Sequence, residues 1–250
     1  MTRRRFLLLQ AREPGDGSAR HELECFAQSL GVPVEDIQPW DLLQGAPDAR
    51  SLESVDMLLV GGSGAFSVLD THHAWLREFM GFLEHTVVGE AFPTFASCFG
   101  FQALVVAGGG TVVKDVDNAE LGTFDIHLTS AGEADPLVGV YRPNFKGQLG
   151  HKDRADRLPA GCVHLAYSDR VPYQAFRIEG APVFATQFHP ELDREGNAYR
   201  CRAYASIYSS TGVAAEMQRV IDGLDDSPEA SALMPRWVEQ VLGAAVPNTD

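Results

Sequence analysis

A cysteine, a histidine and a glutamate in this chain could together form a catalytic triad. Cys98 lies in the run Ala-Ser-Cys-Phe-Gly-Phe-Gln, and His189 and Glu191 follow much later in the run Gln-Phe-His-Pro-Glu. A thiolate attacks a carbonyl carbon, an imidazole accepts the thiol proton and later protonates the leaving group, and a carboxylate fixes the imidazole tautomer. The three residue types therefore predict acyl transfer through a thioester.

The residues around Cys98 predict that it lies in a sharp turn between a strand and a helix. Residues 92–96 read as a short buried strand, and residues 99–107 read as a helix that ends at the three glycines 108–110. The residues two positions before and after Cys98 are Ala and Gly, as a tight nucleophile elbow requires. The positive end of the following helix also favours the thiolate.

His189 and Glu191 follow a second apolar segment, residues 183–188, which reads as a strand. In extended backbone, residues two positions apart project to the same side. We therefore expect the imidazole and the carboxylate to meet, with Pro190 stiffening the spacing between them.

A glycine-rich turn supplies the third part of the predicted site. Residues 60–66 (Val-Gly-Gly-Ser-Gly-Ala-Phe) follow an apolar strand predicted over residues 55–60. Glycines let the main chain present N–H groups to a developing negative charge without interference from Cβ atoms. We expect an oxyanion hole made of the backbone N–H groups of Gly62, Ser63 and Phe99.

In this order, the three segments resemble the class I glutamine amidotransferase family, whose Cys-His-Glu members release ammonia from the glutamine side chain. The resemblance covers roughly residues 5–210 and is strongest to free-standing relatives of the GMP synthase glutamine amidotransferase domain. It implies that Cys98 is the nucleophile, His189 the base and Glu191 the orienting carboxylate. It also implies a small γ-glutamyl substrate, glutamine or a relative of it, and no cofactor.

The resemblance also bears on the roles of three further positions. The Gln102 amide is implied to help hold the amino-acid end of the substrate, and His151 falls where family members often carry a histidine near the mouth of the site. Phe101 stands where the family usually has His. We expect Phe101 to make the pocket wall more apolar and to favour γ-glutamyl amides with apolar leaving groups.

Other residues of catalytic type have simpler interpretations. Ser63 does not fit a serine-hydrolase elbow, because Ala65 stands where that motif has its last glycine. The adjacent His72 and His73 lack further ligands at metal spacing, so no metal site is expected. The other cysteines and histidines are expected to be packing or surface residues: Cys25, Cys162, Cys201, His21, His85, His127 and His164.

The composition indicates a soluble enzyme in a reducing compartment. The chain has 250 residues, 45% of them hydrophobic, and a formal net charge of -14, which disfavours nucleic-acid and anionic-membrane partners. Its four cysteines follow no disulfide pattern, and the apolar run near the start is too short for a secretion signal or a membrane span. We expect a cytoplasmic protein.

Alternating strand and helix patterns predict an α/β fold with flavodoxin-like layering: an open, mostly parallel sheet, helices on both faces and a small antiparallel extension. The parallel part is predicted to hold strands over 6–10, 55–60 and 92–96 and helices over 19–30, 71–88 and 99–107. The antiparallel extension is predicted to hold strands over 111–114, 121–129, 163–168, 173–178 and 183–188, before a helix over 198–209.

The domain prediction divides the chain near residue 212. Residues 1–212 are expected to form one class I glutamine amidotransferase-like domain, and residues 213–250 a C-terminal helical extension with helices over 214–224 and 229–242. The extension exceeds what the family core requires. We expect it either to cover the sheet or to form an oligomer contact, which would make the protein a homodimer.

Two classes of function remain open. The first is an enzyme that hydrolyses a γ-glutamyl amide through a thioester on Cys98. Its substrate would be glutamine, with the ammonia passed to a synthetase partner, or a γ-glutamyl peptide or amine, with no partner. The second is a non-catalytic regulatory or binding subunit on the same fold, for which Phe101 is the only hint. The intact set of Cys98, His189 and Glu191 favours the enzyme.

Overall fold

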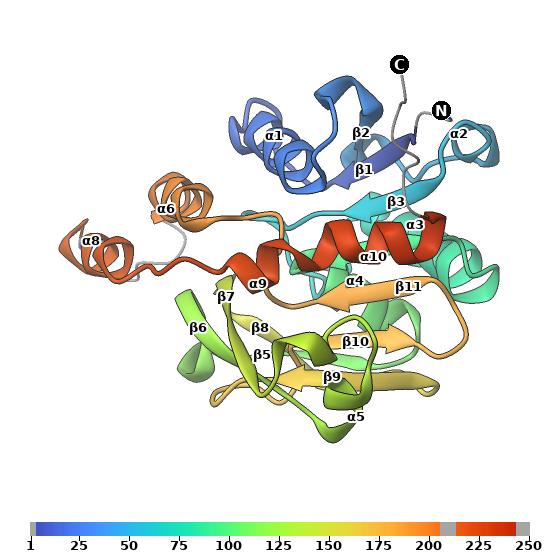
Figure 1. Cartoon of the computed structure of the whole chain (residues 1–250). Coiled ribbons are helices and arrows are strands. Elements are labelled where there is room, and N and C mark those ends of the chain that lie inside the picture. Colours follow the sequence, from blue (N-terminus) through green and yellow to red (C-terminus); the bar gives the residue numbers. More distant parts are fainter. Residues whose placement is uncertain (1–3, 206–213, 244–250) are drawn as a thin grey trace, which may run out of the picture.

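A nine-stranded sheet with a two-stranded ribbon beside it organises the chain, as a computed structural model describes it for residues 4–205 and 214–243 (Figure 1). In spatial order, the strands of the sheet are β2 Ile37–Asp41, β1 Phe6–Gln10, β3 Met57–Val60, β4 Thr94–Ser97, β11 Val183–Thr186, β10 Ala175–Ile178, β9 Cys162–Tyr167, β6 Glu120–Leu128 and β7 Asn144–His151. The ribbon pairs β5 Thr111–Lys114 with β8 Asp153–Arg157. Neighbours from β2 to β11 are parallel, and those from β11 to β7 are antiparallel.

The central strands are buried on both faces because each face is covered by helices. In β1, Phe6 and Leu8 pack into one hydrophobic cluster, while Leu7 and Leu9 pack into another on the opposite face. Two helices cover each face (Figure 1): α1 Ser18–Leu30 and α10 Leu233–Leu242 on one, α3 Ala74–Phe82 and α4 Phe99–Ala107 on the other. The predicted open sheet with helices on both faces is confirmed.

Shorter elements connect these layers. The remaining helices are α2 Ala49–Leu52, α5 Ser130–Ala134, α6 Arg194–Ala203, α8 Ala214–Asp222 and α9 Pro228–Ser231. Single turns of 3₁₀-helix occur at Val34–Asp36, Leu42–Gln44, Val116–Asn118 and Gly139–Tyr141, and α3 continues into a π-helical segment, Leu83–Gly89. Within residues 4–205 and 214–243, none of the helices has both the length and the apolar character that a bilayer span requires.

The C-terminal region packs on the sheet, one of the two roles expected for it. The expected single helix over 229–242 is divided into α9 and α10. Trp237 of α10 is buried and lies edge-on to Phe95 of β4, with the ring centroids 5.4 Å apart. Its neighbours Leu233 and Met234 belong to the same hydrophobic cluster as Phe95. Residues 206–209 of the expected helix over 198–209, and 213 and 244–250 of the extension, lie outside the described residues.

The antiparallel part of the sheet is larger than predicted, and one predicted member of it belongs elsewhere. β7 and β8 were not expected, because their polar and glycine-containing sequences lack an apolar alternation. The strand expected over 183–188 is β11, which ends at Thr186 and runs parallel to β4 in the middle of the sheet. All four residues of β11 are buried, as is typical of a strand covered on both faces.

Candidate active site

Cys98 lies at a strained turn between β4 and α4, as the sequence predicts. Its φ of 52° and ψ of -103° are unusual for a residue with a Cβ atom, and its N–H donates to the Thr186 carbonyl of β11 at 2.8 Å. Gly100 is required two positions later, since a Cβ there would lie 2.7 Å from the Val60 carbonyl oxygen. The turn therefore holds the thiol at the carboxyl edge of the sheet, over the N-terminus of a helix.

His189 and Glu191 form a buried pair beyond the end of β11. Nδ1 of His189 lies 2.6 Å from Oε1 of Glu191, so the predicted contact is present. The reason given for it was wrong, because β11 ends at Thr186 and the two residues lie in a turn, in which the Leu192 N–H donates to the His189 carbonyl. The His189 N–H donates to the Gln148 carbonyl of β7 at 2.8 Å, which fixes the turn against an unpredicted strand.

Electrostatics separate Cys98 and His189 from the other candidates. Burial alone lowers the pKa of His189, but the Glu191 carboxylate and the Cys98 sulfur outweigh it and raise the pKa to about 10. Burial instead raises the pKa of the other three thiols and keeps them unreactive: Cys25 to about 12, Cys162 to about 11 and Cys201 to about 11.

The glycine turn passes close to both reactive side chains. A Cβ on Gly62 would lie 2.8 Å from Cε1 of His189 and 3.7 Å from Cβ of Cys98, so only glycine fits there. The peptide between Gly61 and Gly62 is held on both sides: its carbonyl accepts from Gly100 N–H at 3.2 Å, and its N–H donates to Glu22 Oε1 at 3.1 Å. The Gly62 N–H, one of the three predicted oxyanion donors, is thus engaged by a carboxylate.

Ser63 and Phe99, the other two predicted donors, line the pocket beside Cys98. The Ser63 hydroxyl donates to the Ala11 carbonyl at 3.0 Å and accepts from the Phe66 N–H at 3.1 Å. These two contacts hold the turn at the end of β1. The hydroxyl is therefore a structural group of the turn, in keeping with the exclusion of Ser63 as a nucleophile.

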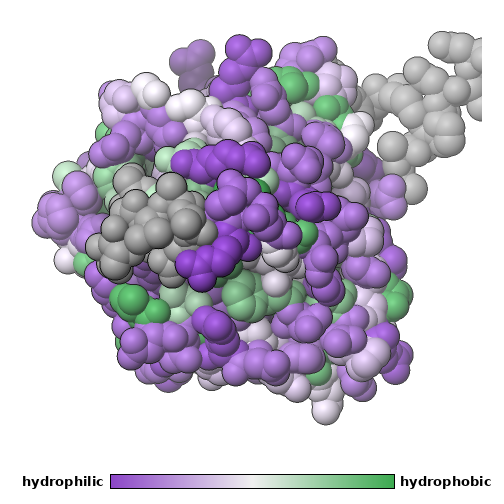
Figure 2. Space-filling model, turned by 90° about the vertical axis from the view of Figure 1, so that its left-hand side faces the viewer, coloured by the Kyte–Doolittle hydropathy of each residue, from purple (hydrophilic) through white to green (hydrophobic). Residues whose placement is uncertain are grey.

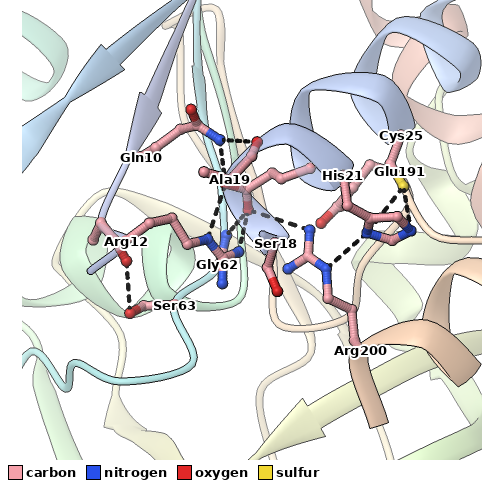
Figure 3. Close-up of polar contacts among 12 residues, drawn as sticks. Gln10, Arg12, Ser18, Ala19, His21, Cys25, Gly62, Ser63, Glu191 and Arg200 are labelled. Carbon is pink, nitrogen blue, oxygen red and sulfur yellow. Dashed lines mark hydrogen bonds and ion pairs between the residues drawn. The ribbon is translucent and has the colours of Figure 1, made fainter. Parts of the chain in front are cut away.

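Behind the turn lies the fully buried carboxylate of Glu22, which sequence reasoning missed. Besides Gly62 N–H, its oxygens accept from Arg12 Nη2 at 2.6 Å and from Gln10 Nε2 at 2.9 Å. Two arginines approach this carboxylate, Arg12 from the end of β1 and Arg200 from α6 (Figure 3). Arg200 is the more distant, with Nη2 at 3.8 Å from Oε1.

The Arg12–Glu22 pair is held in its charged form. Burial raises the pKa of Glu22, but Arg12 and Arg200 outweigh it and keep the pKa below its ordinary value. Burial lowers the pKa of Arg12, and Glu22 more than compensates. One signal was available in the sequence: Glu22 lies four residues before Phe26 on the buried face of α1, where a glutamate needs a partner.

A pocket of about 320 Å³ opens beside Cys98. It lies on the face where the carboxyl ends of the parallel strands meet, a face whose surface is largely hydrophilic (Figure 2). Its lining residues come from the glycine turn and the residues after it, the elbow and its helix, the end of β7 and the ribbon: Ser63, Gly64, Ala65, Phe66, Ser67, Leu69, Asp70, Cys98, Phe99, Gln102, Lys114, Gly150, His151, Lys152 and Asp153. The pocket is thus suited to a polar substrate.

The two residues after the elbow glycine have opposite roles. Gln102 lines the pocket, and its Nε2 donates to the Asp153 carbonyl at 2.8 Å and to Gln187 Oε1 at 3.1 Å. Phe101 does not line the pocket, so the expected apolar wall is absent. Its side chain is fully buried in the core and packs on Phe176, with the ring centroids 5.1 Å apart. Phe101 and Gln102 point differently because successive helical residues project about 100° apart.

His151, expected near the mouth of the site, lines the pocket and forms a second buried pair with Glu120. Its Nε2 lies 2.9 Å from Glu120 Oε2, and its Nδ1 lies 3.0 Å from the Asp153 carbonyl. Glu120 also accepts from the Ser168 hydroxyl at 2.7 Å and from Gln174 Nε2 at 2.6 Å. Both oxygens of Glu120 therefore accept hydrogen bonds from donors in the surrounding strands and loops.

The adjacent histidines His72 and His73 pack as aromatic side chains. Their rings lie 4.0 Å apart, and His73 meets Phe66 edge-on at 5.4 Å. In the part of the chain that the structure describes, no three His, Cys, Asp or Glu side chains gather as a metal site would require.

Comparisons with known proteins agree with this geometry. The family model "Glutamine amidotransferase class-I" matches residues 28–199, which include Cys98, His189 and Glu191. A "GMP synthase [glutamine-hydrolyzing]" from Thermosipho melanesiensis is 29% identical over 157 residues, 63% of this chain and 28% of that protein. One from Nitratiruptor sp. is 33% identical over 107 residues, 40% of this chain and 19% of that protein. The chain spans less than a third of the length of these relatives.

Solved structures support the fold. A glutamine amidotransferase from Thermotoga maritima superimposes with a TM-score of 0.75 at 15% identity, over 98% of this chain and all of that one. A glutamine amidotransferase from Methylobacillus flagellatus gives a TM-score of 0.66 at 18% identity, over 95% of this chain and 94% of that one. At these identities the likeness shows a shared architecture.

Proposed function

Because the chain belongs to the class I glutamine amidotransferase family, we propose that it hydrolyses the side-chain amide of glutamine through a thioester on Cys98. The observation that carries this proposal is the position of Cys98, at a strained turn beside the buried His189–Glu191 pair and open to a pocket. A nucleophile, a base and an orienting carboxylate thus lie within one site.

In the first half-reaction His189 acts first as a general base and then as a general acid. Nδ1 is engaged by Glu191, so Nε2 is the nitrogen that accepts the Cys98 proton. The sulfur attacks the amide carbon, and the carbonyl π electrons move onto oxygen. When they return, the C–N bond breaks and His189 gives its proton to the departing nitrogen. Ammonia leaves, and the γ-glutamyl group remains on Cys98 as a thioester.

The negative oxygen of each tetrahedral intermediate is stabilised by backbone N–H groups. Ser63 and Phe99 are the donors beside Cys98, and Gly62 joins them when its N–H leaves Glu22. One such donor typically contributes about 10²- to 10³-fold to turnover in acyl-transfer enzymes. Holding the glycine turn in place is therefore part of catalysis.

In the second half-reaction water replaces the amine. His189 accepts a proton from water, the resulting hydroxide attacks the thioester, and the C–S bond breaks to release glutamate and restore Cys98. Gln102 helps hold the amino-acid end of the substrate. Since its Nε2 is engaged by Asp153 and Gln187, its carbonyl oxygen is the group that accepts from the substrate ammonium.

The ammonia is proposed to pass to a synthetase partner. The relatives named as glutamine-hydrolysing GMP synthases are more than three times the length that this chain spans in them. A γ-glutamyl hydrolase acting alone, or a non-catalytic subunit, gains no support from Phe101, because that side chain lies in the core.

Active-site labelling tests the nucleophile. A diazo-ketone analogue of glutamine is expected to alkylate Cys98 and to spare Cys25, Cys162 and Cys201, as located by peptide mass spectrometry. The three other thiols, with their raised pKa values, serve as internal controls. A label found on any of them in the folded protein would contradict the assignment.

Kinetics of variants test whether Cys98 and His189 act together in one catalytic step. Cys98→Ala and His189→Ala are each expected to lower glutamine turnover by roughly 10³-fold or more, and the double variant to lose little beyond either one. Losses that multiply would mean that the two residues do not act in one step.

A further inference from the structure

Two separate spaces adjoin Cys98, and His189 lines only one of them. The pocket of about 320 Å³ is lined by Cys98, but His189 is not among its lining residues. A second, smaller cavity of about 30 Å³ is lined by both Cys98 and His189. In acyl transfer the base must give a proton to the leaving nitrogen and later take one from water, so both molecules must stand within its reach. The small cavity is the space that lies on the side of the base.

Buried side chains enclose this small cavity. Leu192, Cys201 and Tyr204 line it and are buried, and Leu121 at the start of β6 lines it and is half-buried. Gly62 forms another part of the wall, where a Cβ would lie 2.8 Å from Cε1 of His189. One water molecule occupies about 30 Å³ in the liquid. The cavity therefore has the size of a single molecule of water or ammonia.

One buried donor at the cavity is unused. Arg200 lines the cavity and is 8% exposed, and within the described residues its Nη2 has no hydrogen-bond partner, although it lies 3.8 Å from Glu22 Oε1. Its Nε donates to Nδ1 of His21 at 3.1 Å, which holds the guanidinium in place (Figure 3). The second arginine of the wall is engaged, since Arg12 Nη1 donates to the Tyr204 hydroxyl at 2.6 Å. A buried N–H without an acceptor is costly, so the cavity suits a small molecule with a lone pair.

We propose that this cavity receives the ammonia released from the substrate and then the water that hydrolyses the thioester, one molecule at a time, with Arg200 Nη2 as the hydrogen-bond donor to each. This rests on the proposed function, because it assigns a place to the two small molecules of that reaction. The leaving group must then be no larger than ammonia. The chain therefore selects unsubstituted amides, which is the opposite of the preference for apolar leaving groups expected from Phe101.

Both half-reactions fit one cavity because ammonia and water are similar in size and each offers a lone pair to Arg200. As the C–N bond breaks, its electron pair stays on nitrogen, which takes the proton of His189 and departs as neutral ammonia. Water then enters, gives a proton to His189 and forms the new C–O bond. The C–S bond breaks with its electron pair on the sulfur of Cys98, and His189 returns the proton to that sulfur.

Substrates that differ only in the leaving group test the size limit. They are glutamine and γ-glutamyl methylamide, which release ammonia and methylamine. One extra carbon in a closed site should lower kcat/KM of wild type for the methylamide to about a tenth of that for glutamine or less. Leu121→Ala and Leu192→Ala enlarge the cavity, and each should raise the ratio of kcat/KM for methylamide to that for glutamine by about tenfold.

Leu69→Ala is the matched control, because Leu69 lines the pocket and not the small cavity. It should leave the ratio at the wild-type value, and thermal melting shows which variants are folded. The intrinsic reactivity of the two amides is the same in every variant, so the change in the ratio reports on the cavity alone. A ratio that stays at the wild-type value in both cavity variants, or that rises equally in Leu69→Ala, would overturn the size limit.

The donor is tested by Arg200→Met. Loss of one charge-assisted hydrogen bond to water should slow breakdown of the thioester by about tenfold, so that the γ-glutamyl enzyme accumulates and is detected by mass spectrometry of acid-quenched samples. Arg200→Lys should reduce the accumulation, and Arg202→Met, at an exposed position of the same helix, should show none. If kcat falls in Arg200→Met without accumulation of the thioester, or does not fall, Arg200 is not the donor to water.

These outcomes also separate the inference from the proposed function. If wild type releases no ammonia from glutamine, the proposed function fails and the inference falls with it. If wild type hydrolyses glutamine, but neither the size of the leaving group nor Arg200 matters as expected, only the inference about the cavity fails.

Discussion

Two buried histidine–carboxylate pairs each have their histidine in the lining of a cavity beside Cys98, and they differ in how fully their hydrogen-bonding atoms are used. Oε1 of Glu191 accepts from His189 at 2.6 Å, and within the described residues its Oε2 has no hydrogen-bond partner. Glu120 accepts from His151 and from two further side chains, and His151 uses both of its nitrogens. The first pair leaves one imidazole nitrogen for Cys98, and the second leaves none.

The difference separates a pair that can move protons from one whose imidazole is fully occupied by hydrogen bonds. A general base needs a nitrogen that can gain and lose a proton during each turnover. His189 has that nitrogen, and His151 does not. The same two residue types, placed in different hydrogen-bonding surroundings, thus suit one pair to proton transfer and the other to a structural role.

We expect the two pairs to differ most in how much each contributes to the stability of the folded protein. Glu120→Gln disrupts a buried carboxylate that is hydrogen-bonded to three side chains, and we expect it to lower the free energy of unfolding by about 3 kcal/mol or more. Glu191→Gln should cost less, because fewer hydrogen bonds depend on Glu191. Urea denaturation measures the free energy of unfolding of both variants. Equal losses of stability would mean that the number of hydrogen bonds to the carboxylate does not determine the loss.

The effects on kcat should have the reverse order, with the larger loss in Glu191→Gln. Glu191→Gln should lower kcat by about 10²-fold, roughly 2.7 kcal/mol, because it loosens the tautomer of His189, yet by less than Cys98→Ala does. Glu120→Gln should leave kcat near wild type, because both ring nitrogens of His151 are engaged and none is left for proton transfer. Steady-state kinetics on the folded variants measures both kcat values. A loss of kcat in Glu120→Gln as large as that in Glu191→Gln would mean that the two pairs have the same role.

The pH dependence of stability should sharpen the comparison in the smallest steps, one pH unit at a time. The folded-state pKa of His189 is raised from 6.5 to about 10, so its stabilising effect is complete below pH 6.5 and is lost as pH rises through 10. The gap in unfolding free energy between wild type and His189→Gln should narrow by at most about 1.4 kcal/mol per pH unit across that window. A gap that stays constant from pH 6.5 to 10.5 would contradict the raised pKa.

Local sequence patterns predicted the elbow well. The helix after Cys98 begins and ends at the expected residues, because Gly100 and the three glycines after Ala107 are strong local signals. The His189–Glu191 contact was also predicted, although through a strand that ends earlier. These features depend on residues that are close in the sequence.

What could not be predicted depends on long-range contacts between polar residues. β7 and β8 are defined by their partners across the sheet and the ribbon, since their own sequences are polar. Glu22 reaches Gly62 from forty positions away, which periodicity alone does not reveal. Phe101 was assigned to the pocket because it follows the nucleophile closely, but the helix turns its side chain into the core.

The packing of α10 on the sheet limits how this protein can exchange parts with its relatives. The region that matches the family ends at residue 199, yet Trp237 completes the apolar layer over Phe95, three residues before Cys98. A chimaera joined at the end of the matched region would inherit the catalytic motifs and leave the strand behind them open to water. The region that the family model matches is therefore smaller than the unit that folds, and recombination here must carry α10 along with the active site.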